Sequence, residues 1–182
     1  GEISLAHNGV LFLDELAEWS RHAIEGLRQP LESGVVAIAR AEGHCEFPAR
    51  FQLVAAMNPC PCGWAGDASG RCRCSEEIVL RYRARLSGPL LDRIDLQVDV
   101  PRLQPAELRG DAPRGEPTAA VRERVLAARE RQLSRAGKTN TALSQAETER
   151  DCRLENAEQA LLEEAMAKLM LSARAAQLIL RV

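Results

Sequence analysis

The 182-residue sequence has no glycine-rich loop ending in Lys-Ser or Lys-Thr, the motif that cradles nucleotide phosphates. Its one Lys-Thr pair is Lys138-Thr139, preceded by Gly137. Gln132 stands where the first glycine of such a loop would be. The chain by itself is therefore not expected to hold the phosphates of a nucleotide.

Other features are scarce or missing. Aromatic residues make up only 3% of the chain, so the predicted core consists mainly of Leu, Ala, Val and Ile. No apolar run approaches the roughly 18 residues that cross a bilayer, so no membrane contact is expected. The net charge of −2 gives no global sign of a nucleic-acid binder. The sequence has neither a secretory signal nor an initiator Met, which predicts a segment of a longer protein.

Four of the six cysteines cluster in one short stretch, as Cys60-Pro-Cys62 and Cys72-Arg-Cys74. A secreted disulfide scaffold would spread its cysteines along the chain, so the cluster indicates a metal site in a reducing, cytoplasmic setting. Four thiolates favour tetrahedral Zn²⁺, although each pair is separated by one residue rather than the usual two to four. Free thiols, or a disulfide formed on purification, are the alternatives.

The first hundred residues predict an α/β domain. The apolar runs 10–13 and 52–56 are typical of strands buried on both faces, and 96–100 alternates like a third strand. Residues 35–39 and 45–47 flank a polar tip and predict a β-hairpin.

Local signals place the helices of this first domain. Ser20 is a candidate N-cap for a helix that would bury Ile24, Leu27 and Leu31. Pro30 should kink or shorten that helix, and Gly34 should end it. A basic helix is predicted from about Glu76 to Leu86, with Arg81 and Arg85 one turn apart.

The composition changes after the first hundred residues. Residues 101–117 hold four of the nine prolines and predict a linker. Residues 118–182 are predicted to be all-helical, with helices over about 118–134, from Ser144, over about 155–169, and from Ser172 to the end. The third of these should bury Leu161, Leu162, Ala165, Met166 and Leu169.

Polar residues follow the two apolar runs. Asp14-Glu15 comes directly after the first, and Asn58 after the second. Carboxylates at the carboxyl ends of parallel strands can hold Mg²⁺ and polarise an attacking water, and an amide beside them could reach the same water or a phosphate. The alternatives are a surface turn after a core strand for Asp14-Glu15 and a turn-forming Asn before Pro for Asn58.

Two arginines occupy positions suited to phosphate contact. Arg93 lies in the loop before the third predicted strand, where it could act as an arginine finger on a neighbouring subunit. Arg174 opens the last helix and could reach a nucleotide between the domains. The alternatives are an ion pair of Arg93 with Asp92 or Asp95, and a solvated helix start for Arg174.

The order of these elements resembles that of an AAA+ ATPase whose phosphate loop lies upstream. GEISLAHNGVLFLDEL, ARFQLVAAMNPCPCG, RLSGPLLDRIDL and LSARAAQLILRV resemble the magnesium-chelatase-like AAA+ family, in its ComM/YifB branch, over essentially the whole chain. The resemblance implies an AAA+ core over residues 1–100, from Walker B to the arginine finger. It also implies a helical, truncated lid domain over 118–182.

By this resemblance Asp14 and Glu15 are the Walker B pair, and Asp14 is the Mg²⁺ ligand. Asn58 is the sensor-1 residue, Arg93 the arginine finger and Arg174 the sensor-2 arginine. Asp14, Asn58 and Arg174 would contact ATP-Mg²⁺. The hairpin around Arg40 matches a pore hairpin, and Arg40 is therefore a candidate DNA contact.

The resemblance further implies a cytoplasmic homo-hexamer that drives DNA remodelling by ATP hydrolysis. The 182 residues alone are predicted to be inactive, and monomeric or artificially associated. Two alternatives stay open: a chelatase-type subunit that drives metal insertion by a partner protein, and a non-catalytic scaffold.

Overall fold

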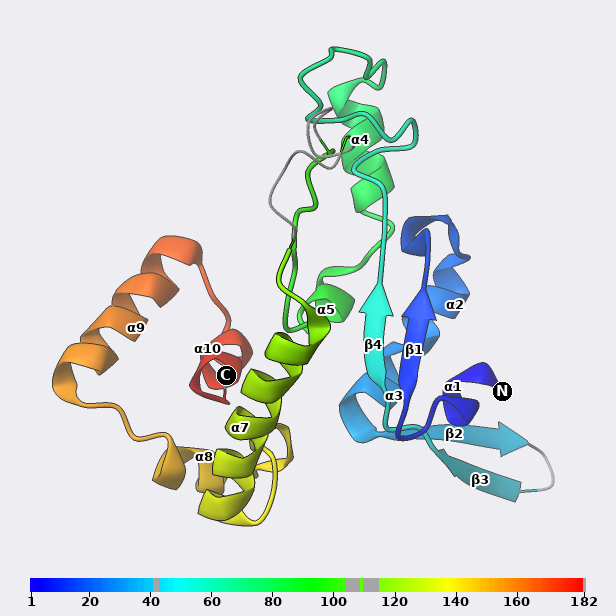
Figure 1. The fold of residues 1–182 in the computed structure, drawn as a ribbon. Helices are drawn as coiled ribbons and strands as arrows, with labels where there is room; N and C mark the ends of the chain where they lie inside the picture. The colour runs from blue at the N-terminus through cyan, green and yellow to red at the C-terminus, as the bar shows by residue number, and fades with distance from the viewer. Residues whose placement is uncertain (41–42, 104–108, 110–114, 182) are drawn as a thin grey trace. The chain divides into compact units, whose positions relative to one another are not determined.

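The computed structural model describes residues 1–40, 43–103, 109 and 115–181. The chain forms two compact units, 1–98 and 99–182 (Figure 1). The first is mixed α/β and the second is helical. None of the described helices is both long enough and apolar enough to cross a membrane.

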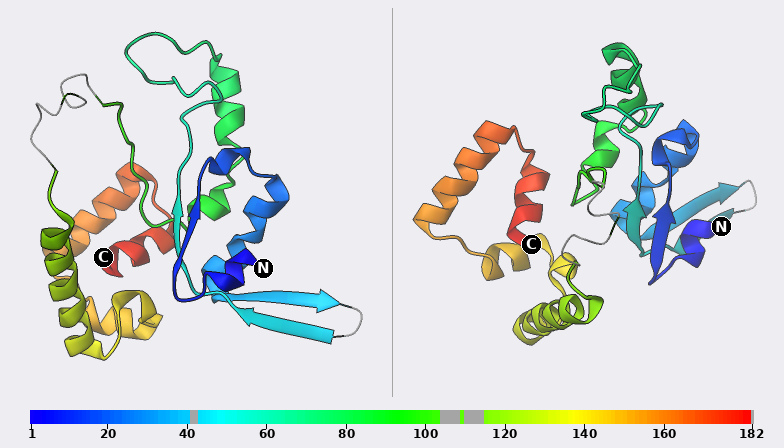
Figure 2. Two further views of the ribbon diagram at one scale, coloured as in Figure 1. Left: turned by 45° about the vertical axis from the view of Figure 1, so that its right-hand side comes forward. Right: turned by 45° about the horizontal axis from the view of Figure 1, so that its top comes forward.

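Two small sheets organise the first unit. Strands β1 (Val10–Leu13) and β4 (Gln52–Ala55) pair in parallel, so that Leu13 lies opposite Ala55. Strands β2 (Val35–Arg40) and β3 (Gly43–Pro48) form an antiparallel hairpin, as predicted (Figures 1 and 2). The backbone of Arg40 ends β2 opposite Gly43. The predicted tip residues Ala41 and Glu42, and the side chain of Arg40, lie outside the described part of the chain.

Short helices cover one face of the parallel sheet. The helices of this unit are the single turn α1 (Glu2–Leu5), η1 (Leu16–Glu18), α2 (Arg21–Gly26), α3 (Arg28–Ser33), α4 (Glu76–Arg83) and α5 (Gly88–Leu91). The core of this unit consists of Leu13, Leu16, Ile24, Leu27, Leu86 and Leu90. It fixes the sheet from one side only.

Three local predictions about the helix pair after β1 are confirmed. The Ser20 hydroxyl accepts a hydrogen bond from the Ala23 amide and caps α2. Pro30 lies in the first turn of α3, where its missing N–H leaves no helical bond unmade, and the helix is divided at Leu27. Gly34 ends α3 with a φ of 71°, in the left-handed region that favours glycine.

The expectation that the strands are buried on both faces is wrong. Leu13 is buried, but Val10, Phe12 and Val54 are 63%, 60% and 43% exposed. Successive side chains of a strand point to opposite faces, and helices pack on only one face of this sheet among the described residues.

The predicted third strand over residues 96–100 is also wrong. The segment has no strand structure, and Leu96, Val98 and Val100 are 76%, 79% and 87% exposed. Alternating side chains form a strand only when a neighbouring strand supplies backbone partners, and none of the described strands pairs with this segment.

The second unit contains α7 (Thr118–Ala136), η2 (Asn140–Ala142), α8 (Gln145–Asp151), α9 (Asn156–Leu169) and α10 (Ala173–Arg181). Gly137 ends α7, and Ser172 caps the last helix by accepting from the Ala175 amide. Most of the predicted linker, 104–108 and 110–114, lies outside the described residues.

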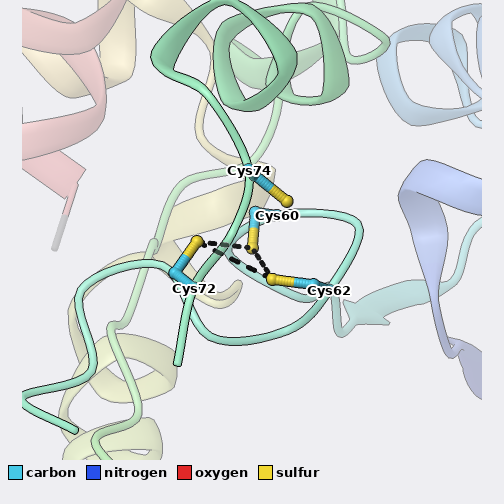
Figure 3. Close-up of side chains that lie close together, drawn as sticks. All are labelled: Cys60, Cys62, Cys72 and Cys74. Atoms are coloured by element: carbon cyan, nitrogen blue, oxygen red, sulfur yellow. Dashed lines mark hydrogen bonds between the residues drawn. The ribbon is translucent and has the colours of Figure 1, made fainter. Parts of the chain in front are cut away.

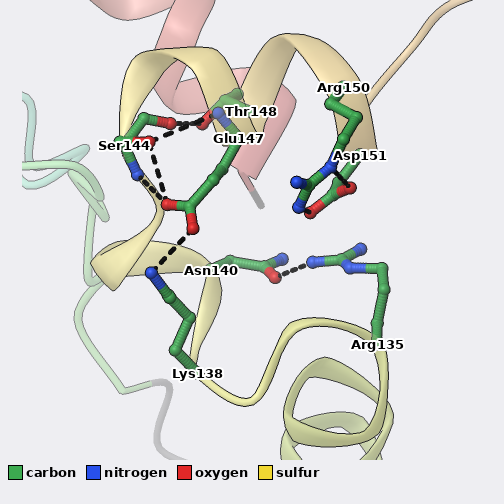
Figure 4. Close-up of polar contacts among 8 residues, drawn as sticks. All are labelled: Arg135, Lys138, Asn140, Ser144, Glu147, Thr148, Arg150 and Asp151. Carbon is green, nitrogen blue, oxygen red and sulfur yellow. Dashed lines mark hydrogen bonds and ion pairs between the residues drawn. The ribbon is translucent and has the colours of Figure 1, made fainter.

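Polar contacts near α8 hold the turn that joins it to α7 (Figure 4). Ser144 and Glu147 form a reciprocal capping box, and the Lys138 ammonium lies 2.7 Å from the Glu147 carboxylate. The Lys138 ammonium, followed by hydrogen bonds from the Ser144 amide and hydroxyl, lowers the pKa of Glu147 to about 2.

The predicted buried side of α9 is only partly right. Leu162, Ala165 and Met166 are half-buried, whereas Leu161 and Leu169 are each 68% exposed. Helical spacing selects a face, but burial also needs a surface packed against it.

Candidate functional site

The parallel register brings the Asp14–Glu15 pair and Asn58 to one edge of the sheet. Asp14 and Glu15 follow β1, and Asn58 follows β4 by three residues. The Ala56 amide donates to the Leu13 carbonyl at 2.9 Å, and the Leu16 amide donates to the Ala56 carbonyl at 2.9 Å. These bonds continue the ladder past the strand ends, so the segments that carry Asp14, Glu15 and Asn58 stay adjacent.

The turn at Asp14 and Glu15 is fixed by hydrogen bonds to the carboxylate and the carbonyl of Asp14. Glu15 has a φ of 50°, an unusual conformation for a residue other than glycine. Its amide donates to the Asp14 carboxylate at 2.8 Å. The indole N–H of Trp19 donates to the Asp14 carbonyl at 2.9 Å. Both side chains remain exposed, as a metal- or water-binding carboxylate pair must be.

Helix α4 packs against this turn through Tyr82 and Arg85, which were not predicted as site residues. Tyr82 is 5% exposed, and burial, followed by the nearby Glu18 carboxylate, raises its pKa. Arg85 lies just beyond the helix, 3.7 Å from Glu18, and donates to the Trp19 carbonyl at 3.2 Å. Arg81 pairs with Glu77 one turn before it, and the side chains of Arg81 and Arg85 are 75% and 43% exposed.

Arg93 lies in the loop after α5, and its ion-pair partner differs from the two that the sequence offered as alternatives. The guanidinium pairs with Glu32 of α3, and not with Asp92 or Asp95, and also donates to the Pro89 carbonyl. Its side chain is 14% exposed, and its Nε is buried without a hydrogen-bond partner among the described residues. No local sequence pattern indicates an ion-pair partner that lies 61 residues away along the chain.

Arg174 lies in the first turn of α10 with an exposed side chain. It belongs to the second unit, whereas Asp14, Glu15, Asn58 and Arg93 belong to the first. The structure therefore brings the four first-unit residues into one folded unit, and Asp14, Glu15 and Asn58 to one sheet edge.

The four clustered cysteines converge, as Figure 3 shows. Their sulfur atoms all lie within 4.8 Å of one another. The Cys60 sulfur is 3.3 Å from that of Cys62 and 3.8 Å from that of Cys72, and no disulfide joins them. A tetrahedral site with Zn–S bonds of about 2.3 Å has S···S edges of roughly 3.8 Å. The four sulfurs could therefore hold a metal ion such as zinc.

The surroundings of the cluster favour the thiolate form at Cys60 and the thiol form at Cys74. Cys60 is fully buried, and the Ala65 amide donates to its sulfur at 3.3 Å. Burial raises the pKa of Cys60, but hydrogen bonds from the Cys62 thiol and from backbone amides outweigh it and lower the pKa to about 6. At Cys74, a hydrogen bond from the Cys62 backbone lowers the pKa. Contacts with the Cys62 and Cys60 thiols, together with burial, outweigh this bond and raise the pKa of Cys74 to about 11. Metal binding would have to displace the remaining protons.

The segment between the two cysteine pairs consists of tight turns and has no helix or strand of its own. Gly63, Gly66 and Gly70 all have positive φ, and Arg71 stacks over the Trp64 ring at 4.8 Å from its centroid. Cys45 and Cys152 lie outside the cluster.

Two protein-family models together match nearly the whole chain. Residues 1–108 match the model described as magnesium chelatase, subunit ChlI, and residues 115–182 match that of the ChlI C-terminal region. The chain is 54% identical over 183 residues to the competence protein ComM of Haemophilus influenzae, covering all of this chain and 35% of ComM. It is 49% identical to YifB of Escherichia coli, covering all of this chain and 36% of YifB. The chain thus spans about a third of the length of these relatives.

The two matches follow the same order as the two folded units, with the α/β part first and the helical part second. By family model and by identity over its full length, the chain belongs to the magnesium chelatase subunit ChlI family, alongside ComM and YifB.

Proposed function

We propose that this chain is the Walker B-to-lid portion of a ring-forming AAA+ ATPase that couples ATP hydrolysis to DNA remodelling. The phosphate loop would then lie upstream in the full-length protein. The observation that carries the proposal is the parallel β1–β4 register, which places Asp14, Glu15 and Asn58 at one edge. Ligands of open α/β sheets bind at this carboxyl edge of the strands.

Each residue at the edge has a role that suits its position. Asp14 would hold Mg²⁺, which neutralises charge on the phosphates. Glu15, held at a φ of 50° beside it, would orient and polarise the attacking water. Asn58, across the register, would donate its amide to that water or to the γ-phosphate.

Arg93 would act on the nucleotide of a neighbouring subunit in a homo-hexamer. Its guanidinium is held by Glu32, so phosphate contact would exchange one carboxylate partner for another anion. Arg174 would contact the nucleotide from the helical unit as a sensor-2 residue. A side chain that serves a second subunit explains why hydrolysis should need the assembled ring.

The DNA part of the proposal comes from the resemblance to the ComM/YifB branch. ComM, which shares 54% identity with this chain, is named a competence protein. Arg40 at the end of β2 is the candidate DNA contact. The family name supports the second candidate, a chelatase-type subunit that drives metal insertion by a partner.

We also propose that the cysteine cluster binds Zn²⁺. The soft, four-sulfur donor set and the S···S distances of 3.3 to 3.8 Å for three of the pairs support zinc. Metal analysis of protein purified without chelator should give about one equivalent of zinc per chain. Less than about a tenth of an equivalent would contradict the assignment.

ATP turnover by the full-length protein, with and without single-stranded and branched DNA, tests the main proposal. Stimulation by DNA is the expected result. Turnover that responds only to a partner protein would favour the chelatase-type function. No turnover under any of these conditions would leave a non-catalytic scaffold and overturn the proposal.

A further inference from the structure

The cysteine loop begins at the predicted nucleotide edge. Cys60 follows Asn58 by two residues, and the Gly63 amide donates to the Cys60 carbonyl at 2.9 Å. Gly63 has a φ of 77°, and a Cβ at this position would lie 3.8 Å from Oδ1 of Asn58. The first turn of the loop therefore lies beside the Asn58 side chain.

The loop ends at helix α4, which turns back toward the same edge. Cys74 directly precedes Ser75, whose hydroxyl accepts from the Ile78 amide and caps the helix. One helix length later, the Arg83 Nε donates to the Pro59 carbonyl at 3.3 Å. This bond closes α4 onto the start of the loop, one residue from Asn58.

Helix α4 also reaches the Asp14–Glu15 turn. Tyr82 is buried beside Glu18, and Arg85 holds the Trp19 carbonyl. The Trp19 indole in turn donates to the Asp14 carbonyl. An unbroken set of contacts therefore leads from the end of the cysteine loop to the turn that carries the predicted Walker B pair.

The two cysteine pairs lie at the two ends of this loop. A metal bound by Cys60 and Cys62 together with Cys72 and Cys74 would cross-link the segment after Asn58 to the segment before α4. Closing a loop of roughly 15 residues with a covalent or metal cross-link removes conformational entropy from its open states. Without the metal, thiol contacts of 3.3 to 3.8 Å join Cys60, Cys62 and Cys72.

We infer that the metal-bound cysteine loop is a positioning element for the nucleotide edge. It holds Asn58 through the turn at Gly63, and it holds the Asp14–Glu15 turn through α4. The cysteines themselves do not touch the nucleotide. The consequence for turnover rests on the proposed function, whereas the coupling between the loop and the sheet edge does not.

Amide hydrogen exchange on this chain tests the coupling without any requirement for activity. Zinc loading should slow exchange by about tenfold at Ala56 and Leu16, and at the α4 amides Val79 and Ala84, relative to the chelated chain. Each of these amides has its acceptor at the sheet edge or within α4 and its cap. Protection confined to residues 60–74 would overturn the inference.

Turnover by the full-length protein tests the consequence. Replacing Cys72→Ser together with Cys74→Ser should lower kcat by about tenfold while the KM for ATP changes less than about twofold, because the site is misaligned rather than removed. Cys45→Ser together with Cys152→Ser is the matched control and should leave kcat unchanged, since neither residue belongs to the cluster.

Chelation of the wild-type protein followed by zinc addition covers the case in which the serine variant does not fold. Loss and recovery of kcat with zinc is expected, and kcat that is unchanged in zinc-free protein would contradict the inference. If wild-type protein shows no turnover at all, the proposed function fails, and the exchange experiment alone decides the coupling.

Discussion

The two units of the molecule are stabilised in different ways. The first has ten buried apolar residues among those described, including Ile24 and Leu90. The second has only Leu143 and Ala176 as buried apolar residues among those described, and relies on helix caps and on the Lys138–Glu147 pair. A rigid unit suits a site that must hold carboxylates in place, whereas a unit held by caps and ion pairs suits a domain that contributes single side chains.

The largest expected contrast lies in the two arginines assigned to the nucleotide. Arg93→Ala in the full-length protein should lower ATP turnover by about a thousandfold, because an arginine finger stabilises transition-state charge. Binding of a fluorescent ATP analogue should remain measurable. Arg174→Ala should weaken nucleotide binding and turnover less, since it acts from an exposed helix start.

Glu32→Gln is the matched control for Arg93→Ala, because it removes the ion pair and keeps the guanidinium. Turnover retained in Glu32→Gln and lost in Arg93→Ala would assign the effect to the finger. Equal loss in both variants would show that the Arg93–Glu32 pair matters for folding instead.

Core truncation should separate the units by stability. Ile24 is 1% exposed and packs within the main cluster, so Ile24→Ala should cost about 2–5 kcal/mol in the free energy of unfolding. Leu143 is 4% exposed but has few buried neighbours, so Leu143→Ala should cost less, about 2 kcal/mol at the low end of that range. Urea unfolding of the chain, followed by the Tyr82 and tryptophan signals and by circular dichroism, measures both. Equal costs would remove the contrast.

The smallest expected effect is the acid response of Glu147 in the second unit. The folded-state pKa of Glu147 is lowered to about 2 from the usual 4.5, so the carboxylate stabilises the fold above pH 4.5. This stabilisation is lost as the pH falls from 4.5 through about 2. Glu147→Gln should remove that part of the pH dependence, which circular dichroism melting curves between pH 2 and 6 would detect. A wild-type and a variant curve of the same shape would contradict the assignment.

The sequence predicts best what is decided locally. Ser20, Gly34 and Ser144 act within one turn of their own position, and the helix ends they predict are confirmed. The convergence of the four cysteines follows from their spacing and is confirmed as a cluster. Caps, breakers and closely spaced ligands depend on neighbours along the chain.

Features that depend on residues far away along the chain, such as strand pairing and burial, are predicted less well. Residues 96–100 have the side-chain alternation of a strand but no described pairing partner. The exposed Leu161 and Leu169 have helical spacing without a packed surface. The Arg93–Glu32 pair and the Tyr82–Glu18 contact join segments more than 60 residues apart. Periodicity describes which side chains share a face and does not say what covers that face.

Single-site replacement of Glu15 tests the central claim most directly, because Glu15 is assigned to the chemical step and not to binding or folding. ATP turnover and ATP retention should be measured for the full-length wild-type protein and for Glu15→Gln, with Glu2→Gln, which changes an exposed carboxylate of α1, as the control. We expect Glu15→Gln to bind ATP, to hydrolyse it at least about a hundredfold more slowly and to hold it in a trapped complex, while Glu2→Gln still turns over. Turnover by Glu15→Gln at the wild-type rate would remove this residue from catalysis and contradict the assignment of the β1–β4 edge as the hydrolysis site.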